Sequence, residues 1–304
     1  MKKLALFLLG LIVILFIVFA VRNNTMQQSS GKLQVAASFY PMYFFGSQIG
    51  GDKVSVFNIT PASAEPHDYE PTTQDVARIN NSKMLILNGG KLEAWGDKIK
   101  DQLKGTDVLI VTAGEGLADR EINEDGQNIQ DPHVWQNPIL AKKEAAVVEK
   151  GFEKIDPKDE TYFQANLQKL NTELDTLNSE YKNGLVSCKL KDFVTSHAAF
   201  GYMAQQYGIN QVAISGVSPD EEPSSQKLAD IANLVKKESI KVVFFESLVS
   251  PKLSDTIATE TGAKALVLDP LEGIPQKAAD TGANYFSIMR QNLSNLQEAL
   301  QCSK

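Results

Sequence analysis

One long amphipathic segment near the middle of the chain constrains the fold most. Between Lys158 and Asn183 the sequence is a continuous run of helix-forming residues, and its apolar residues recur at spacings of three and four. These apolar residues are Phe163, Leu167, Leu170, Leu174, Leu177 and Tyr181. The pattern predicts one helix of about 26 residues, roughly 39 Å long. The chain of 304 residues is long enough for two domains, and we interpret this helix as a rigid spacer between them.

Strand-like and helix-like segments alternate on both sides of the spacer, which is typical of an α/β fold with parallel sheets. The predicted strands are residues 33–39, 53–59, 84–87, 107–111, 192–196, 211–214, 241–245 and 264–268. The acidic, glycine-containing residues 112–132 are expected to form a long loop. We therefore expect two lobes, each a small parallel sheet flanked by helices. The expected divisions are an N-terminal lobe at 32–156, the linking helix at 157–184 and a C-terminal lobe at 185–304.

Residues 1–31 carry a targeting signal rather than part of the fold. Two lysines precede an unbroken apolar run from Leu4 to Val21, and a polar tether follows. Eighteen residues in a helix reach roughly 27 Å, close to the ~30 Å of a bilayer core. We favour an uncleaved membrane anchor, and a cleaved signal peptide ending near Ala20 stays open as the alternative. No cysteine lies near this segment, so a lipid-modified N-terminus is not expected. Either interpretation places the lobes in the periplasm or on the outer face of the cytoplasmic membrane.

Export makes disulfide formation possible, because Cys188 and Cys302 would meet an oxidising environment. We predict a disulfide between them, which would close a ring of about 115 residues. It would fasten the C-terminal helix to its lobe. The alternative is two unrelated buried thiols.

The charge of the chain excludes one class of partner. Its net charge is −7, from 37 acidic and 30 basic residues, and the basic residues are scattered rather than gathered on one face. Nucleic-acid binding requires a basic patch or stripe. We therefore expect no nucleic-acid partner, and we expect the protein to be a monomer.

The chain has three histidines, and each lies in a turn or at the end of a predicted strand. His197 follows the strand 192–196, whereas His67 and His133 lie in tight turns flanked by prolines. Loops at the carboxyl ends of parallel strands converge on one crevice, where ligands collect. We propose that the three histidines bind one metal ion between the two halves of the chain.

A carboxylate from the second half is expected to complete the site, because zinc takes about four N, O or S donors at roughly 2.0 to 2.2 Å. Glu246 and Asp269 both follow predicted strands and are both candidates. We favour Asp269 as the ligand. Glu246 is then expected to orient a ligand imidazole or to cap the next helix. Asp68, beside His67, is a further candidate for the orienting role.

Several short motifs carry a family resemblance. They are Pro66–Pro71, Asp131–Trp135, Thr195–Tyr202, Phe245–Ser247 and Leu268–Leu271. On these motifs the chain from Leu33 to Cys302 resembles the zinc- and manganese-binding solute-binding proteins of bacterial ABC importers. The resemblance implies two lobes joined by one rigid helix, a metal site in the cleft between them, and delivery of the ion to a membrane permease. It maps the first, second and fourth ligands to His67, His133 and Asp269.

The third ligand distinguishes the branches of this family. Members with histidine there resemble zinc proteins, and members with glutamate resemble manganese proteins. This chain has His197, and three imidazoles with one carboxylate suit zinc, while manganese prefers more oxygen. We therefore expect zinc, with manganese as the alternative. The chain departs from many zinc members because residues 112–132 contain no histidine and because it has no lipid-attachment cysteine.

Two other functions compete with metal transport. A zinc hydrolase or lyase would use three histidines and an activated water, and it needs an open coordination position. Asp269 as a fourth ligand would fill that position, and no serine or cysteine nucleophile paired with a base is apparent, so we expect no enzymatic activity. The third interpretation is a surface protein that uses this fold in cell adhesion.

Overall fold

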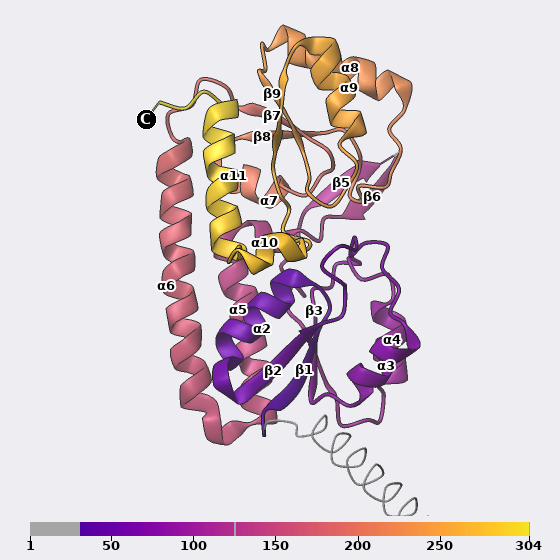
Figure 1. Ribbon diagram of the computed structural model, residues 1–304, viewed down its shortest axis with the longest axis vertical. Helices are drawn as coiled ribbons and strands as arrows, with labels where there is room; N and C mark the ends of the chain where they lie inside the picture. Colours follow the sequence, from indigo (N-terminus) through magenta and orange to yellow (C-terminus); the bar gives the residue numbers. More distant parts are fainter. Residues whose placement is uncertain (1–30, 125, 304) are drawn as a thin grey trace, which may run out of the picture. The chain divides into compact units, whose positions relative to one another are not determined.

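The computed structural model describes residues 31–124 and 126–303, and the described residues from Gln34 onward form one compact unit. This unit contains two four-stranded sheets flanked by helices (Figure 1). The predicted α/β fold is thereby confirmed. The predicted targeting segment falls almost wholly on residues 1–30, which lie outside the described residues. Among the described helices, none combines the length and the apolar character needed to cross a bilayer.

The first sheet has the strand order β2-β1-β3-β4, and its central strand β3 runs parallel to both neighbours. The strands are β1 (Leu33–Ala37), β2 (Val54–Asn58), β3 (Met84–Leu87) and β4 (Leu109–Thr112). Helices α2 (Tyr40–Gly50) and α5 (Pro138–Ile155) pack on one side, and α3 (Thr73–Asn80) and α4 (Gly96–Gln102) on the other (Figure 1). All four residues of β3 are buried, as expected for a parallel strand covered on both faces.

The second sheet has the order β10-β9-β7-β8, and its strands pair in parallel. The strands are β7 (Asp192–Thr195), β8 (Asn210–Ala213), β9 (Val242–Phe245) and β10 (Lys264–Val267). Helices α8 (Ser225–Lys237) and α9 (Lys252–Thr261) pack on the face that carries Val194 and Val243. Helix α7 (Gly201–Tyr207) packs against β8, and α11 (Tyr285–Ala299) against β10.

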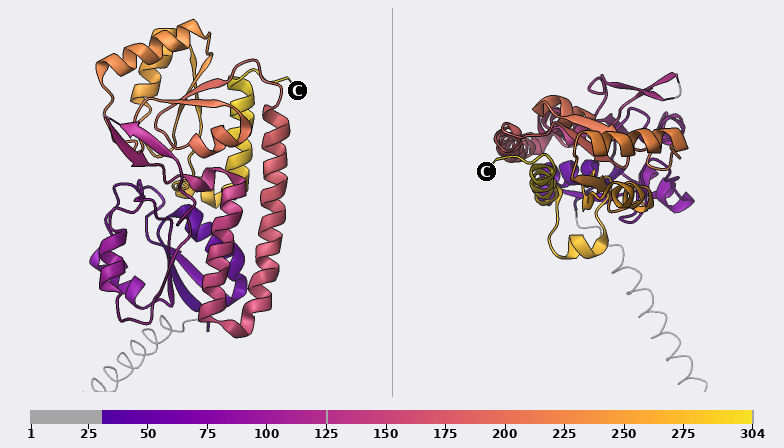
Figure 2. Two further views of the ribbon diagram at one scale, coloured as in Figure 1. Left: turned by 180° about the vertical axis from the view of Figure 1, so that it is seen from behind. Right: turned by 90° about the horizontal axis from the view of Figure 1, so that it is seen from above.

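Helix α6 (Glu160–Leu185) is the predicted long helix, and it joins the two lobes. It packs against α2 and α5 of the first lobe and against α7 and α11 of the second (Figures 1 and 2). Its buried residues are Phe163, Leu170, Leu174, Leu177, Tyr181 and Leu185. The Tyr181 hydroxyl donates a 2.7 Å hydrogen bond to the carbonyl of Met289 in α11. The helix is therefore anchored at both lobes, although the exact lobe boundaries at residues 156 and 184 stay predictions.

The acidic segment 112–132, which we expected to be a long loop, contains regular structure. It contains an antiparallel hairpin of β5 (Glu121–Glu124) and β6 (Gln127–Gln130), with Ile122 opposite Ile129. A hydrogen bond from Asn123 Nδ2 to Asn128 Oδ1 at 3.1 Å adds to the pairing. Gly126 adopts a φ of +85°, which favours glycine at the turn. The strands escaped prediction because each contains a single isoleucine among polar residues and therefore shows no apolar alternation. A short helix, α10 (Gln276–Asp280), was also not predicted.

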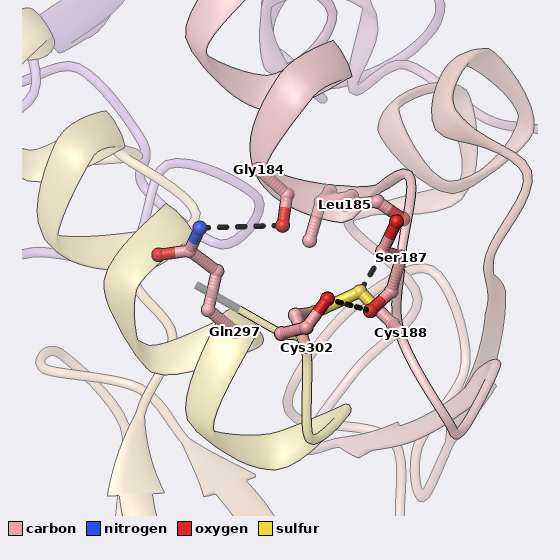
Figure 3. Close-up of a disulfide and its surroundings, with 7 residues drawn as sticks. Gly184, Leu185, Ser187, Cys188, Gln297 and Cys302 are labelled. Carbon is pink, nitrogen blue, oxygen red and sulfur yellow. Dashed lines mark hydrogen bonds between the residues drawn. A yellow bond between two sulfur atoms is a disulfide. The ribbon is translucent and has the colours of Figure 1, made fainter.

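The predicted disulfide between Cys188 and Cys302 is present (Figure 3). It joins the segment after α6 to the end of α11. Two hydrogen bonds lie beside it, from Ser303 N to the Ser187 carbonyl at 3.0 Å and from Gln297 Nε2 to the Gly184 carbonyl at 3.2 Å. The bridge therefore fastens the C-terminal helix to the long helix that carries both lobes.

Replacing both Cys188 and Cys302 with serine is expected to lower the free energy of unfolding, because the disulfide restricts the unfolded chain. The chain-entropy model gives a loss of up to about 4 to 5 kcal/mol for a ring of this size. Denaturant unfolding of the oxidised wild type and of the double variant measures the difference. A reductant should destabilise the wild type and leave the variant unchanged. Equal unfolding midpoints for both proteins would contradict this stabilising role.

Candidate metal centre

Four side chains from four separate turns meet where the two lobes contact each other. His67 lies between β2 and α3, His133 directly after β6, His197 after β7 and Glu272 after β10. One potential ligand atom from each lies within 4.8 Å of all the others. His133 and His197 are fully buried, and Glu272 is 1% exposed. The structure thus places the three predicted histidines together, with two from the first lobe and one from the second.

Five of the six distances between the donor atoms match those of a tetrahedral zinc site. His133 Nε2 lies 3.2 Å from His67 Nε2 and 3.4 Å from His197 Nε2. Glu272 Oε1 lies 3.4 Å from the Nε2 of His67, 3.2 Å from that of His133 and 3.3 Å from that of His197. A regular tetrahedron with zinc–donor distances of about 2.0 to 2.1 Å has donor–donor distances of about 3.3 to 3.4 Å. The arrangement therefore suits a small four-coordinate cation at its centre.

Two buried carboxylates fix the orientation of the imidazoles. Asp131 Oδ1 lies 2.8 Å from His133 Nδ1, and Glu246 Oε1 lies 2.7 Å from His197 Nδ1. Since a carboxylate can only accept, we assign the proton of each ring to Nδ1. The Nε2 lone pairs then face the common centre, as they do when such rings bind a metal ion.

The titration of these groups reflects a buried site that attracts cations. Burial lowers the pKa of His67. Burial also opposes protonation of His133 and His197, but hydrogen bonds and charge interactions with Asp131, Glu246 and Glu272 outweigh it. The pKa of His133 is therefore raised, and that of His197 is raised well above its ordinary value. Conversely, the imidazoles overcome the effect of burial on Glu272 and hold the pKa of its carboxyl well below the usual range. The negative charge beside His133 and His197 thus favours a positive charge at this centre.

The expected fourth donor, Asp269, is not in this group, and the structure brings Glu272 to the imidazoles instead. Asp269 Oδ1 accepts a 2.8 Å hydrogen bond from the backbone of Leu271, and its Oδ2 accepts one from the Ser247 hydroxyl. The side chain of Asn292 in α11 accepts a hydrogen bond from the backbone N–H of Asp269 and donates one to its backbone carbonyl. Asp269 therefore closes the turn that presents Glu272. We placed the ligand at the strand end, but the turn carries it three residues further.

The orienting carboxylates agree only in part with the sequence analysis. Glu246 contacts the His197 ring, and its role in orienting a metal ligand stays a prediction. Asp68 instead contacts Asp220 in the other lobe, and this hydrogen bond, together with burial, raises its pKa to about 6. The carboxylate on the His133 ring is Asp131, which the sequence analysis did not single out. Its position two residues before His133 in an Asp-Pro-His turn was the available signal.

Hydrogen bonds between the two lobes join the turn that carries His133 to the turn that carries Glu272. Trp135 Nε1 donates a 2.8 Å hydrogen bond to the carbonyl of Pro270, and Gln136 Nε2 donates to the same oxygen. The Tyr285 hydroxyl of α11 in turn donates to the Trp135 carbonyl at 2.6 Å. These bonds are buried, so the spacing between the two donors depends on contacts that neither lobe makes alone.

Matched substitutions separate Glu272 from Asp269. Glu272→Gln removes the charge beside the imidazoles, and we expect zinc affinity to fall by more than about 100-fold, the upper end for groups outside the coordination sphere. Asp269→Asn disturbs only the turn and is expected to cost about tenfold or less. Competition with a chromophoric chelator measures both affinities. A larger loss for Asp269→Asn than for Glu272→Gln would show that the Glu272 assignment is wrong.

Comparisons with known proteins agree with this geometry. Residues 35–299 match the family described as zinc-uptake complex component A, periplasmic. The high-affinity zinc uptake system protein ZnuA of Bacillus subtilis is 36% identical over 301 residues, which cover 94% of each chain. The zinc-binding lipoprotein AdcA of Streptococcus pneumoniae is 37% identical over 98% of this chain, which spans only 61% of the length of AdcA.

Solved structures share the fold. The Zn(II)-bound ZnuA-like domain of S. pneumoniae AdcA superimposes with a TM-score of 0.77 and 37% identity, covering 89% of this chain and 99% of that domain. A mutant of the laminin-binding adhesin Lmb of Streptococcus agalactiae gives a TM-score of 0.81 and 34% identity, covering 88% of this chain and 99% of the adhesin. Because the family match covers most of the sequence and these similarities extend over both lobes, the chain belongs to the family of periplasmic zinc-uptake component A proteins.

Proposed function

We propose that the protein binds Zn²⁺ outside the cytoplasmic membrane and delivers it to the permease of an ABC importer. The observation that carries the proposal is the tetrahedron of His67, His133, His197 and Glu272, whose donors come from both lobes. Members of this family are the solute-binding components of metal ABC importers, not enzymes. Zinc is thus the cargo of the protein rather than a catalytic group.

The chemistry of the four donors supports capture rather than catalysis. Catalytic zinc sites keep one position for water or substrate, whereas four protein donors fill a tetrahedral ion. The proposed ligand set leaves no such position. Its three imidazoles and one carboxylate also favour zinc over manganese, which prefers more oxygen donors. Manganese remains the alternative cargo to compare.

The location and assembly of the protein follow from the family only in outline. The family is that of a periplasmic binding component, and AdcA of S. pneumoniae is described as a lipoprotein. We propose an uncleaved N-terminal anchor, a monomeric protein without a nucleic-acid partner, and lobes divided at the ends of the linking helix. Adhesion is a second candidate function, because Lmb is described as a laminin-binding adhesin.

Zinc should stabilise the folded protein, because the unfolded chain does not hold the four donors together. At a free zinc concentration about 1,000 times Kd, the free energy of unfolding should rise by about 4 kcal/mol. Thermal melting of metal-stripped protein with zinc or with manganese measures the effect, and Glu272→Gln serves as the variant with a weakened site. The proposal fails if zinc leaves the wild-type melting curve unchanged. A larger shift with manganese would instead assign that metal as the cargo.

Zinc affinity should decrease as the pH falls, because zinc and protons compete for the imidazoles. The raised pKa of His133 and His197 extends this competition above the ordinary histidine value of 6.5. Affinity should be greatest above the raised pKa and fall about tenfold per pH unit for each displaced proton. Titration calorimetry in buffers of different ionisation enthalpy counts the released protons. Equal affinity at about pH 6 and about pH 8 would contradict this coupling.

A further inference from the structure

Arg120 connects the hairpin before His133 to a helix of the opposite lobe. Its backbone N–H donates to the Tyr202 hydroxyl at 3.0 Å, and its guanidinium lies 5.6 Å from the centre of the Tyr202 ring. Its Nη1 also donates to Gln205 Oε1 at 3.3 Å. Tyr202 and Gln205 both belong to α7 in the second lobe. Arg120 is therefore a contact between lobes that the sequence analysis did not detect.

The same guanidinium reaches the carboxylate that orients a proposed zinc ligand. Arg120 Nε donates to Asp131 Oδ2 at 3.3 Å, and Asp131 is fully buried. The other carboxylate oxygen, Oδ1, accepts the backbone N–H of His133 at 3.0 Å and contacts its Nδ1 at 2.8 Å. The Tyr202 hydroxyl donates to the Asp131 carbonyl at 3.0 Å. One buried aspartate thus joins the cross-lobe contact of Arg120 to the imidazole of His133.

The outer end of this connection lies at the surface. The Arg120 side chain is 32% exposed, although its partner Asp131 is 0% exposed. Arg120 lines a surface cavity of about 560 Å³ together with Ile122 of the hairpin and Gln205 of α7. A movement of the hairpin relative to α7 can therefore change the surroundings of His133 without opening the buried tetrahedron directly.

The helix has a glycine where the guanidinium approaches it. A Cβ built on Gly201 would lie 2.5 Å from Arg120 Nη2, 2.7 Å from Nε and 2.8 Å from Cζ. These distances are too short for van der Waals contact, so any larger residue at Gly201 displaces the guanidinium. The backbone of Gly201 is not in the left-handed region, and alanine suits a helix. Gly201→Ala is therefore a way to move Arg120 without removing its charge.

We propose that Arg120 is a positioning residue that couples zinc retention to the contact between the hairpin and α7. The inference rests on the proposed function, because it takes His133 as a zinc ligand. With Arg120 in place, Asp131 keeps both a cationic partner and its orientation toward His133 Nδ1. When the hairpin leaves α7, the Asp131 carbonyl loses the Tyr202 hydroxyl and the Arg120 guanidinium loses Gln205 Oε1. The guanidinium and the Asp131 carboxylate that it contacts are then less firmly held behind the His133 imidazole. Separation of this contact is then a route by which the ion is released.

The test compares Arg120→Gln and Gly201→Ala with Arg290→Gln in the otherwise intact protein. Arg290 is a matched control, because its Nε also pairs with a carboxylate, Glu180, at 2.9 Å and its guanidinium lies near an aromatic ring, Phe286, at 5.9 Å. Zinc dissociation is followed by transfer to a chromophoric chelator. We expect Arg120→Gln and Gly201→Ala to dissociate about tenfold faster, the lower end for groups outside the coordination sphere. Arg290→Gln should stay within about twofold of the wild type.

A spectroscopic measurement separates positioning from general loss of stability. In the cobalt-substituted protein, Arg120→Gln and Gly201→Ala should change the visible absorption bands of the ion, because the His133 ring is reoriented. Arg290→Gln should leave these bands unchanged. The proposal is overturned if both Arg120→Gln and Gly201→Ala keep the wild-type dissociation rate and cobalt spectrum while His133→Ala abolishes zinc binding. If the wild type does not bind zinc, the proposed function itself fails.

Discussion

The structure depends on the convergence of three imidazole Nε2 atoms and one carboxylate on a point buried between the lobes. Lone pairs and a negative charge at these distances repel one another unless a cation lies among them. Asp131 and Glu246 add two more buried carboxylates behind the rings, so the whole centre carries excess negative charge. Protons offset part of this charge, as the raised pKa of His197 shows. A divalent ion would offset it better, because it would contact all four donors at once.

None of the four donors lies within a helix or strand, so the surrounding scaffold must hold the turns in place. Helix α6 packs against both lobes. Helix α11, linked to it by the Cys188–Cys302 disulfide, reaches the first lobe through the stacking of Tyr285 on Phe44 of α2. Two residues of α11 hydrogen-bond to the turns that carry the donors. The Tyr285 hydroxyl donates to the Trp135 carbonyl, after His133, and the Asn292 amide donates to the Asp269 carbonyl, before Glu272. The Pro270 carbonyl then links the two turns directly. Precise donor spacing is achieved by hydrogen bonds to turns rather than by the regular elements themselves.

Firm binding and release make opposite demands on such a protein. The buried bonds of Trp135 and Tyr285 favour retention, since breaking them would leave unpaired polar groups away from water. The contact of Arg120 with α7 differs because it is partly exposed and its loss leaves the guanidinium accessible to water. A protein that must give up its cargo needs a contact of this second kind. The hairpin of β5 and β6 provides it on the segment that leads directly to His133.

The sequence by itself determined the α/β architecture, the long linking helix, the cysteine pair and the three histidines. These features depend on local periodicity, on strand ends and on the scarcity of histidine and cysteine, all of which can be read along the chain. The hairpin at 121–130, the position of Glu272 rather than Asp269 beside the imidazoles, and the contacts of Asp131 and Arg120 were visible only in the tertiary structure. Asp269 and Glu272 are three residues apart in one turn. The Ser247 hydroxyl and the Leu271 amide hold the Asp269 carboxylate, while Asn292 holds the backbone of Asp269. Ser247 and Asn292 come from other parts of the chain, so no local pattern could reveal which carboxylate faces the imidazoles.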